Sequence, residues 1–329
     1  MVEAADLLRL PYDDSLTEAG VAYACKSLQY TYNRMSLQPI PRLRKIVAGI
    51  AVELAFRRWL ERESVRYELL GATHFTAPDK YDITLGGRRC DVKSFLISHP
   101  DKIKALRADP DYLLSAPALV PLDQLNSDSL GPHDIFLFGF LAGRETHYRS
   151  DLQKALAAGS RHYLLYACIA PEWARPERWV SLGQLALKSN ASREFTVEVG
   201  GQNQKREAHA EQITLTPRTL RQAGLDYYSL LYLHAPELSD GELSIHSPVL
   251  RRTLVIQPGD WGNIWVYGLQ VIIAGWLSKR DFQRRSRLLP AGERTLLYDQ
   301  TRIHNREVPI KNLRPIGELI SLLRESGWA

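Results

Sequence analysis

Apolar residues near the start of the chain recur at helical spacing. Between residues 41 and 61 this spacing predicts an amphipathic helix whose apolar positions are Leu43, Ile46, Val47, Ile50 and Leu54. Residues 1–40 are also predicted to be helical, with the Asp-Asp-Ser run at 13–15 as the cap. Because proline cannot continue a helix, Pro39 and Pro41 are expected to end that first helix.

Two longer runs are apolar at almost every position. Residues 134–142 and 264–277 have this pattern, which is typical of strands buried on both faces of a sheet. Ser278 follows the second run and is a candidate helix cap. A further strand is predicted near 67–72, and the proline-rich residues 98–132 are predicted to form short helices and loops.

The stretch between the two apolar runs mixes helical and alternating patterns. We predict a helix at 150–158, strands at 162–169, 195–199 and 212–216, and a helix running from 217 through 232. No motif with recognisable chemistry occurs here. We interpret residues 145–260 as an inserted recognition or dimerisation module; the alternative is that 160–329 forms a separate C-terminal domain.

The most informative segment is a predicted β-hairpin that spans residues 82–97. Gly86 and Gly87 provide the positive φ angles that a tight two-residue turn needs. Side chains alternate between the two faces of a strand, so Asp91 and Lys93 are expected on one face and Cys90 on the other.

Two carboxylates and an amine on this hairpin suit metal-dependent phosphodiester hydrolysis. Asp82 and Asp91 offer the oxygen ligands that Mg²⁺ prefers, and Lys93 would orient or deprotonate a water or stabilise the developing anion. Glu53 lies beside the apolar stripe of the preceding helix, and Gly49, one turn earlier, would let that helix approach a sheet closely. The alternative is a surface hairpin that carries an ordinary ion pair.

In this order and approximate spacing, the series Glu53, Asp82, Asp91 and Lys93 resembles the PD-(D/E)XK nuclease superfamily, which has the restriction-endonuclease-like fold. Gly49-x-x-x-Glu53 is similar to the helix signature of many members. The literal Pro-Asp pair is Pro78-Asp79, but we favour Asp82 as the first-strand acid because it sits better at the start of the hairpin strand.

The resemblance implies an α/β protein with a mixed central sheet flanked by helices. On this interpretation residues 1–40 are an N-terminal segment, 41–144 and 261–329 form the nuclease core, and 145–260 are the large α+β insertion or second domain. It also implies Mg²⁺, with Mn²⁺ as a substitute, held by Asp82, Asp91, the Val92 carbonyl and Glu53.

The function that the resemblance implies is an endonuclease acting on DNA, expected to be double-stranded, in restriction, defence or repair. Two alternatives stay open: a catalytically silent DNA-recognition subunit with the same fold, and a nuclease for RNA or branched DNA. A homodimer would suit double-strand cleavage.

Composition adds modest support. The net charge is +5, and arginine, whose fork matches phosphate oxygens and base edges, far outnumbers lysine. Candidate nucleic-acid-binding residues are Arg88, Arg89, Lys205, Arg206, Arg284 and Arg285. The three cysteines are scattered, so neither a zinc site nor a disulfide framework is indicated. No apolar run is long enough for a transmembrane helix and the start lacks a signal-peptide pattern, so we expect a cytoplasmic protein without a membrane partner.

Overall fold

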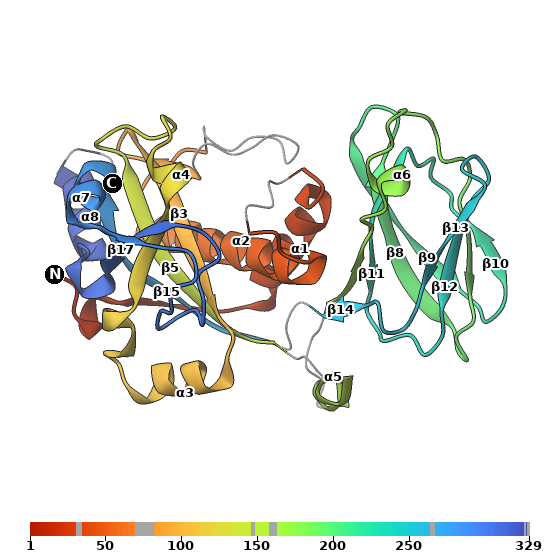
Figure 1. The fold of residues 1–329 in the computed structure, drawn as a ribbon, viewed down its shortest axis with the longest axis horizontal. Helices are drawn as coiled ribbons and strands as arrows, with labels where there is room; N and C mark the ends of the chain where they lie inside the picture. Colours follow the sequence, from red (N-terminus) through yellow and green to blue (C-terminus); the bar gives the residue numbers. More distant parts are fainter. Residues whose placement is uncertain are drawn as a thin grey trace.

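The computed structural model describes residues 1–30, 35–69, 82–145, 149–157, 163–263, 267–325 and 327. Within them the chain forms a mixed α/β lobe and a second lobe built almost entirely of strands (Figure 1). None of the helices in these residues is long and apolar enough to cross a membrane.

The first lobe is organised around a mixed five-stranded sheet. In the described residues its strand order is β1-β15-β5-β3-β2. The strands are β1 (Leu8–Pro11), β2 (Ile83–Leu85), β3 (Arg88–Ile97), β5 (Ile135–Arg144) and β15 (Tyr267–Ser278). Only the β3–β5 pair is parallel, and the other three pairs are antiparallel. The sheet therefore contains segments from before and after the second lobe.

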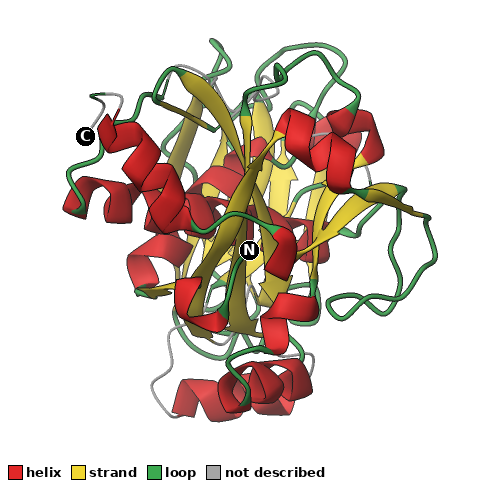
Figure 2. Ribbon diagram, turned by 90° about the vertical axis from the view of Figure 1, so that its left-hand side faces the viewer, coloured by secondary structure: helices red, strands yellow, loops and turns green. Residues whose placement is uncertain are grey.

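Helices cover both faces of this sheet (Figure 2). On one face α2 (Pro39–Arg62) packs against β3, β5 and β15, with α1 (Asp14–Ser27) against α2 and α8 (Ile316–Glu325) in the same core. On the other face lie α3 (Pro100–Ala108), α7 (Lys279–Arg285) and a small sheet made of β4 (Pro117–Pro121), β17 (Asn305–Pro309) and β16 (Arg287–Leu289). The short helix α4 (Leu122–Leu125) follows β4. Three 3₁₀ turns occur at Ala4–Asp6, Tyr112–Ser115 and Ile310–Asn312.

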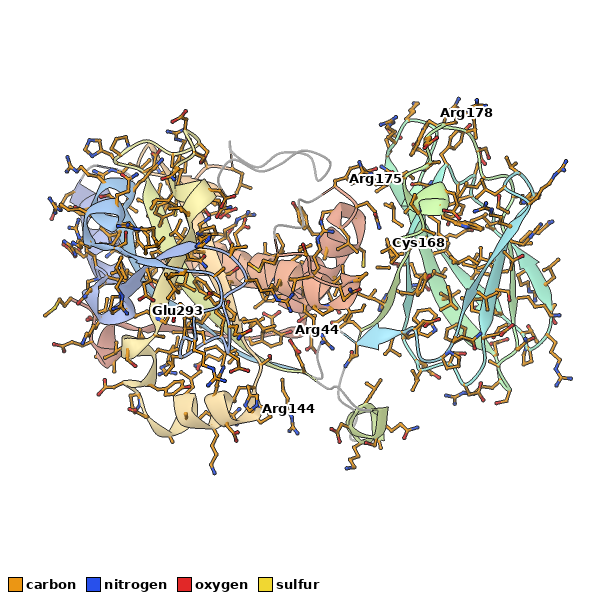
Figure 3. The ribbon with its side chains drawn as sticks, viewed as in Figure 1. Arg44, Arg144, Cys168, Arg175, Arg178 and Glu293 are labelled. Atoms are coloured by element: carbon orange, nitrogen blue, oxygen red, sulfur yellow. The ribbon has the colours of Figure 1, made fainter. Side chains whose placement is uncertain are left out.

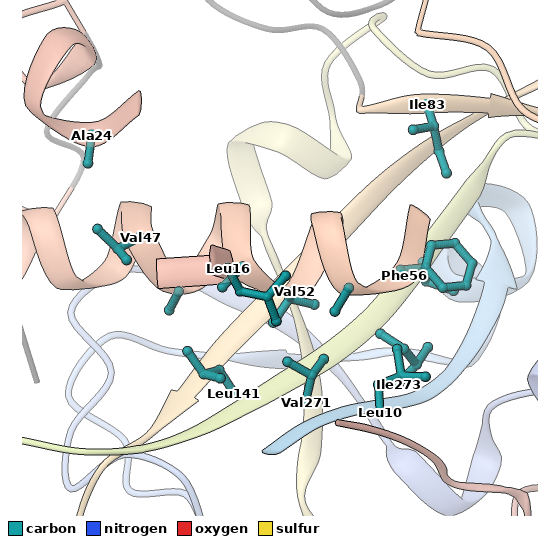
Figure 4. Close-up of a cluster of buried hydrophobic side chains, with 14 of the residues drawn as sticks. Leu10, Leu16, Ala24, Val47, Val52, Phe56, Ile83, Leu141, Val271 and Ile273 are labelled. Atoms are coloured by element: carbon teal, nitrogen blue, oxygen red, sulfur yellow. The ribbon is translucent and has the colours of Figure 1, made fainter. Parts of the chain in front are cut away.

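Strand β5 lies in the middle of the sheet, and its residues Ile135–Gly143 are all buried. Leu137 and Leu141 point into the core beneath α2, part of which Figure 4 shows around Val52. Phe136 and Phe138 point to the opposite face, where each packs against Phe282 of α7 with ring centres 5.6 Å apart. The predicted doubly buried strand at 134–142 is thus confirmed, as is the strand predicted over the second apolar run, of which β15 is the described part.

The second lobe is a pair of packed β-sheets. One sheet has the order β14-β6-β11-β8-β9 and the other β10-β7-β12-β13. The strands are β6 (Leu164–Ala167), β7 (Ala186–Ser189), β8 (Phe195–Gln202), β9 (Ala208–Leu215), β10 (Leu220–Gln222), β11 (Ser229–Ala235), β12 (Leu243–Ser247), β13 (Arg252–Ile256) and β14 (Gly262–Asn263). Their inward side chains form a core of their own. Two short helices, α5 (Arg149–Ala157) and α6 (Pro171–Ala174), accompany these strands.

The two lobes touch through α1, the turn that follows it and the first half of α2. Tyr30 donates a hydrogen bond to the Gln202 side chain at 2.5 Å, and Gln29 donates to the Cys168 carbonyl at 2.5 Å. Arg44, near the centre of Figure 3, donates to the Asn263 carbonyl at 2.7 Å. Arg44 is buried between the lobes, and its guanidinium is hydrogen-bonded there.

The N-terminal prediction was only partly correct. Asp13 does cap α1, accepting a hydrogen bond from the Ser15 amide at 3.0 Å, but α1 ends at Ser27. The two prolines expected to end it instead lie in the first turn of α2, where a missing amide hydrogen costs nothing. The prediction that 1–40 is helical also missed β1, a four-residue strand at the edge of the sheet. Its pattern is too short to be distinguished by periodicity.

Two other segments differ from the sequence prediction. The helix predicted from 217 through 232 is wrong, because this segment contains β10 and the start of β11. Strand β11 is buried on both faces, and a short apolar run of that kind fits either a helix or a strand. Strand β4 was not predicted because it begins and ends with proline, which is tolerated there since β4 is at the edge of its small sheet. Of the strand predicted at 67–72, only a bridge between Glu68 and Thr84 falls within the described residues.

A glycine allows α2 to lie close to the centre of the sheet. A Cβ atom added to Gly139 of β5 would come within 2.5 Å of Val52 Cγ1 on α2 and within 3.2 Å of Ile273 Cδ1 on β15. We expect Gly139→Ala to lower the free energy of unfolding by about 1–3 kcal/mol through overpacking. Urea denaturation measures this, with Gly259→Ala as the control because an added Cβ there meets no atom within 4 Å. Equal stability of the two variants would contradict the close packing of α2 against β5 at Gly139.

Candidate active site

The predicted hairpin is present and is formed by β2 and β3. Gly86 and Gly87 have φ angles of 56° and 70°, as a tight primed turn requires. Ile83 lies opposite Cys90, and both are buried under α2. The hairpin therefore has one apolar face anchored in the core, which holds the register of the residues that follow.

Asp82 lies alongside Asp91 at the point where β2 begins. Its amide donates to the Cys90 carbonyl at 3.0 Å, and its carboxylate accepts from the Val92 amide at 2.6 Å. Asp82 is therefore bonded to the residues on either side of Asp91. Since the N–H and C=O of one strand residue point to the same side, the Val92 carbonyl also faces the edge on which Asp82 lies.

Asp91 and Lys93 occupy the same face of β3, as predicted. Lys93 Nζ lies 2.5 Å from Asp91 Oδ2, and the two side chains are only 11% and 19% exposed. Lys93 also donates to Gln124 Oε1 of α4 at 2.9 Å and lies 5.7 Å from the centre of the Phe136 ring. Gln124 was not found from the sequence, because it is 31 residues away from Lys93 and belongs to no motif.

Cys90 points to the opposite face and is a core thiol, as predicted. Burial raises the pKa of the Cys90 thiol well above its usual value, and the negative charges of Asp82 and Asp91 raise that pKa further. A thiol in this environment stays protonated and is a poor nucleophile.

Glu53 is buried on α2 and forms an ion pair with Arg57 one turn later. Gly49 does allow the predicted close approach, because a Cβ added there would lie 3.2 Å from Ser94 Oγ of β3. Ser94 and Glu53 lie on the α2 side of the sheet, whereas Asp91 and Lys93 project from the other face. The structure therefore brings Asp82, Asp91 and Lys93 together around Val92. Glu53 is not part of this group: it lies on α2, one helical turn after Gly49, where α2 approaches β3.

The donor atoms around Val92 fit a hard divalent cation. Asp82, Asp91 and the Val92 carbonyl all offer oxygen, and Mg²⁺ keeps several waters and needs only one or two protein carboxylates. Within the described residues no group of three or more His, Cys, Asp or Glu side chains is arranged to hold a metal ion. Among the described side chains, Asp82 and Asp91 are the carboxylates beside Val92, and an ion held by them would complete its shell with water and substrate oxygens.

Arg89 is held by hydrogen bonds, although its side chain is 38% exposed. Its backbone amide and its Nε donate to the two carboxylate oxygens of Asp134 at 2.9 and 2.7 Å, and its Nη1 donates to the Ser129 carbonyl at 2.6 Å. Asp134 also accepts from the Gly131 amide at 2.6 Å. This ion pair ties the hairpin to the loop that leads into β5. Arg88, its neighbour, is exposed at the turn.

The other basic candidates lie on separate elements. Lys205 and Arg206 are at the tip of the β8–β9 hairpin in the second lobe, where Arg206 stacks 4.8 Å over the Trp179 ring. Arg284 and Arg285 are on α7, where Arg284 pairs with Asp281 and Arg285 donates to the Asn312 carbonyl. Asp79 of the Pro78-Asp79 pair lies outside the described residues.

Sequence reasoning also missed a cleft that begins at Lys93. It has a volume of about 670 Å³ and runs along β3 between α2 on one side and the 297–303 loop with β4 and α4 on the other. Basic side chains from α2, α3 and that loop line it. Arg44 and Lys45 are adjacent in the chain, but Lys102 and Arg302 are far from them, and no local pattern shows that these side chains share one cleft.

Removing Arg89 tests its role as a structural residue. We expect Arg89→Ala to lower the free energy of unfolding by about 1–3 kcal/mol, because Asp134 would be left as a nearly buried carboxylate short of donors. Arg88→Ala is the matched control and should change stability by less than about 0.5 kcal/mol. Thermal or urea unfolding of both variants provides the measurement, and a stable Arg89→Ala would return Arg89 to the surface-exposed candidates.

Comparison of the chain with models of protein families, with curated proteins and with solved structures found no match. No relative therefore lends this chain a function. A function has to be argued from the arrangement of the chain's own side chains around Val92.

Proposed function

We propose that this chain is a metal-dependent endonuclease that hydrolyses phosphodiester bonds in DNA, serving restriction, defence or repair. We further propose that its first lobe is a restriction-endonuclease-like core. The order of elements supports this: a helix with a buried acid, then a hairpin with an acid at its entrance and Asp-x-Lys on its second strand, then a parallel partner strand.

One observation carries the proposal. Asp82 accepts a hydrogen bond from the Val92 amide, Asp91 directly precedes Val92 in the chain, and the amine of Lys93 is bonded to Asp91. Two carboxylates on neighbouring, partly buried residues are unfavourable unless cations offset their charge. Lys93 supplies one positive charge, and a divalent ion held by Asp82, Asp91 and the Val92 carbonyl would supply more.

Hydrolysis of DNA needs a water oxygen, which gives up a proton, to form a bond to phosphorus. The bond to the leaving deoxyribose oxygen breaks, and that oxygen takes up a proton. Bound Mg²⁺ would supply Lewis acidity and positive charge for the phosphate. Lys93, an ammonium paired with Asp91, is a donor and so is suited to orienting the water or stabilising the phosphate oxygens. Gln124 and Asp91 hold that amine from two sides and thereby limit its rotamers.

A second candidate is a DNA-recognition subunit that does not cleave. The observation that favours it is that the acids already have cationic partners, with Glu53 paired to Arg57 and Asp91 to Lys93. These pairs would have to rearrange when a metal binds. The experiment below separates the two candidates, and a panel that includes RNA and branched DNA tests the choice of substrate.

Asp91→Ala should abolish cleavage while preserving the fold. We expect the cleavage rate of plasmid DNA with Mg²⁺ or Mn²⁺ to fall by at least about a hundredfold, the scale seen when one group that stabilises developing charge is lost. DNA binding should be retained or strengthened, because a negative charge is removed. Asp128→Ala, an exposed acid in the neighbouring loop, is the control. Full cleavage by Asp91→Ala would exclude this site, and binding without cleavage by the wild type would favour the recognition subunit.

The choice of first-strand acid can be tested separately. Because Asp82 is bonded directly beside Asp91, Asp82→Ala should reduce metal-dependent cleavage far more than Asp79→Ala does. Cleavage rates of the two variants at several Mg²⁺ concentrations provide the comparison, and loss of a ligand should also raise the Mg²⁺ concentration needed for half-maximal rate. The reverse ranking would assign the metal to Asp79.

A further inference from the structure

The cleft next to Lys93 follows the open edge of β3. Strand β2 pairs with β3 only as far as Cys90, and no other strand in the described part of the chain continues along that edge. From Lys93 to Ile97 the edge is about 13 Å long at 3.3 Å per residue. The main-chain groups of Ser94 and Leu96 point to the same side as those of Val92, so they face the cleft.

The charges in this cleft are unbalanced. Of its two acids, Glu145 pairs with Arg44 at 3.2 Å and Asp299 with Lys102 at 3.6 Å. Lys45 and Arg302 have no ion pair with a carboxylate among the described residues. The cleft therefore has an excess of positive charge.

The excess positive charge affects the pKa of Lys45. Burial lowers the pKa of the Lys45 amine, and the positive charge of Arg302 lowers that pKa further. Its described contacts are the Met35 sulfur at 3.0 Å and the Tyr298 ring, whose centre is 5.4 Å away. Both cations line the same cleft, Lys45 partly buried and Arg302 exposed, and a bound anion would relieve the repulsion between them.

The walls beside these cations are apolar. Phe95, Ile97, Leu119 and Leu297 are buried residues that line the cleft, and Tyr298 adds an aromatic ring. A volume of about 670 Å³ lies within the roughly 300–1,000 Å³ range of sites for single small ligands. An anion joined to a flat apolar group of that size has the chemistry of a nucleotide.

We propose that this cleft binds an unpaired nucleotide of the substrate strand, next to the phosphodiester positioned at Lys93. Lys45 and Arg302 hold its phosphate, and the wall that includes Tyr298 contacts its base. A paired base lies inside the duplex and reaches such a cleft only when the strand is single or the base is flipped out. This assignment rests on the proposed function, and it selects substrates that are single-stranded or locally unpaired beside the cut.

Binding measured in the Asp91→Ala background tests the assignment without cleavage. The probes are a short fluorescent oligothymidine and a blunt duplex of the same length, both titrated by fluorescence anisotropy without divalent metal. We expect Lys45→Gln with Arg302→Gln to weaken single-strand binding by at least about tenfold. The slope of log K against log salt concentration should flatten by about 0.7, since both side chains hold the same phosphate and each phosphate neutralised on a single strand contributes about 0.7. Duplex binding should change little.

Controls keep the result specific. Arg221→Gln removes an exposed arginine of β10 in the second lobe and should leave both affinities unchanged. Arg302→Gln alone changes only an exposed side chain, so it provides a second variant if the double variant is unstable. Thymidine monophosphate serves as a competitor and should compete far less well than the oligonucleotide. Equal competition would assign the cleft to free nucleotides and overturn the proposal, as would equal losses for duplex and single strand.

The two proposals fail in different ways. If wild type cleaves DNA and Asp91→Ala does not, while the cleft variants bind single strands normally, the nuclease stands and the cleft assignment is overturned. If wild type cleaves nothing, but single-strand binding still depends on Lys45 and Arg302, the nuclease proposal fails and the nucleotide cleft stands.

Discussion

The burial of β5 on both faces is the constraint on which the rest of the first lobe depends. Its side chains alternate between a core under α2 and a cluster of phenylalanines on the other face. A shift of one residue would exchange these two sets, so the register of β5 is strongly specified. Because β3 pairs in parallel with β5, that register also decides which face carries Asp91 and Lys93. The positions of the acid and the amine thus follow from apolar packing several ångströms away.

Within the described residues, part of one edge of the same sheet is unpaired, and both proposals use that edge. Strand β2 is short and covers only the turn end of β3. Beyond β2, the main chain of β3 faces a basic cleft that starts at Lys93. The candidate catalytic residues and the candidate binding cleft therefore follow one another along β3. An edge is usually a liability that proteins cover or charge. Here α2 and the 297–303 loop border it with cations and apolar side chains.

Ion pairs in this region have distinct roles that charge counting cannot separate. Arg89 and Asp134 join the hairpin to the loop before β5, with hydrogen bonds from both main chain and guanidinium. Lys279 supports the same loop by donating to the Ser127 and Leu130 carbonyls. The Lys93–Asp91 pair differs from these because Lys93 also lines the cleft that runs along β3. Two adjacent arginines, 88 and 89, therefore have different surroundings despite identical chemistry.

Local chemistry in the sequence determined the hairpin, the capped start of α1, helix α2 and the doubly buried strands. Each of these depends on neighbours within a few residues: a Gly-Gly turn, a capping side chain, or an apolar period. Asp91 and Lys93 share a face for the same reason, since alternation in a strand is local. The Glu53–Arg57 pair is local as well, because the two residues lie four apart on one helix. Tertiary structure alone decided that Gln124 holds Lys93 and that Lys45 and Arg302 line one cleft. It also decided that the segment from 217 through 232 is mostly strand and turn, because burial against β6 and β8 overrides an ambiguous apolar spacing. Contacts between distant parts of the chain depend on how sheets and helices pack, and no local pattern encodes that packing.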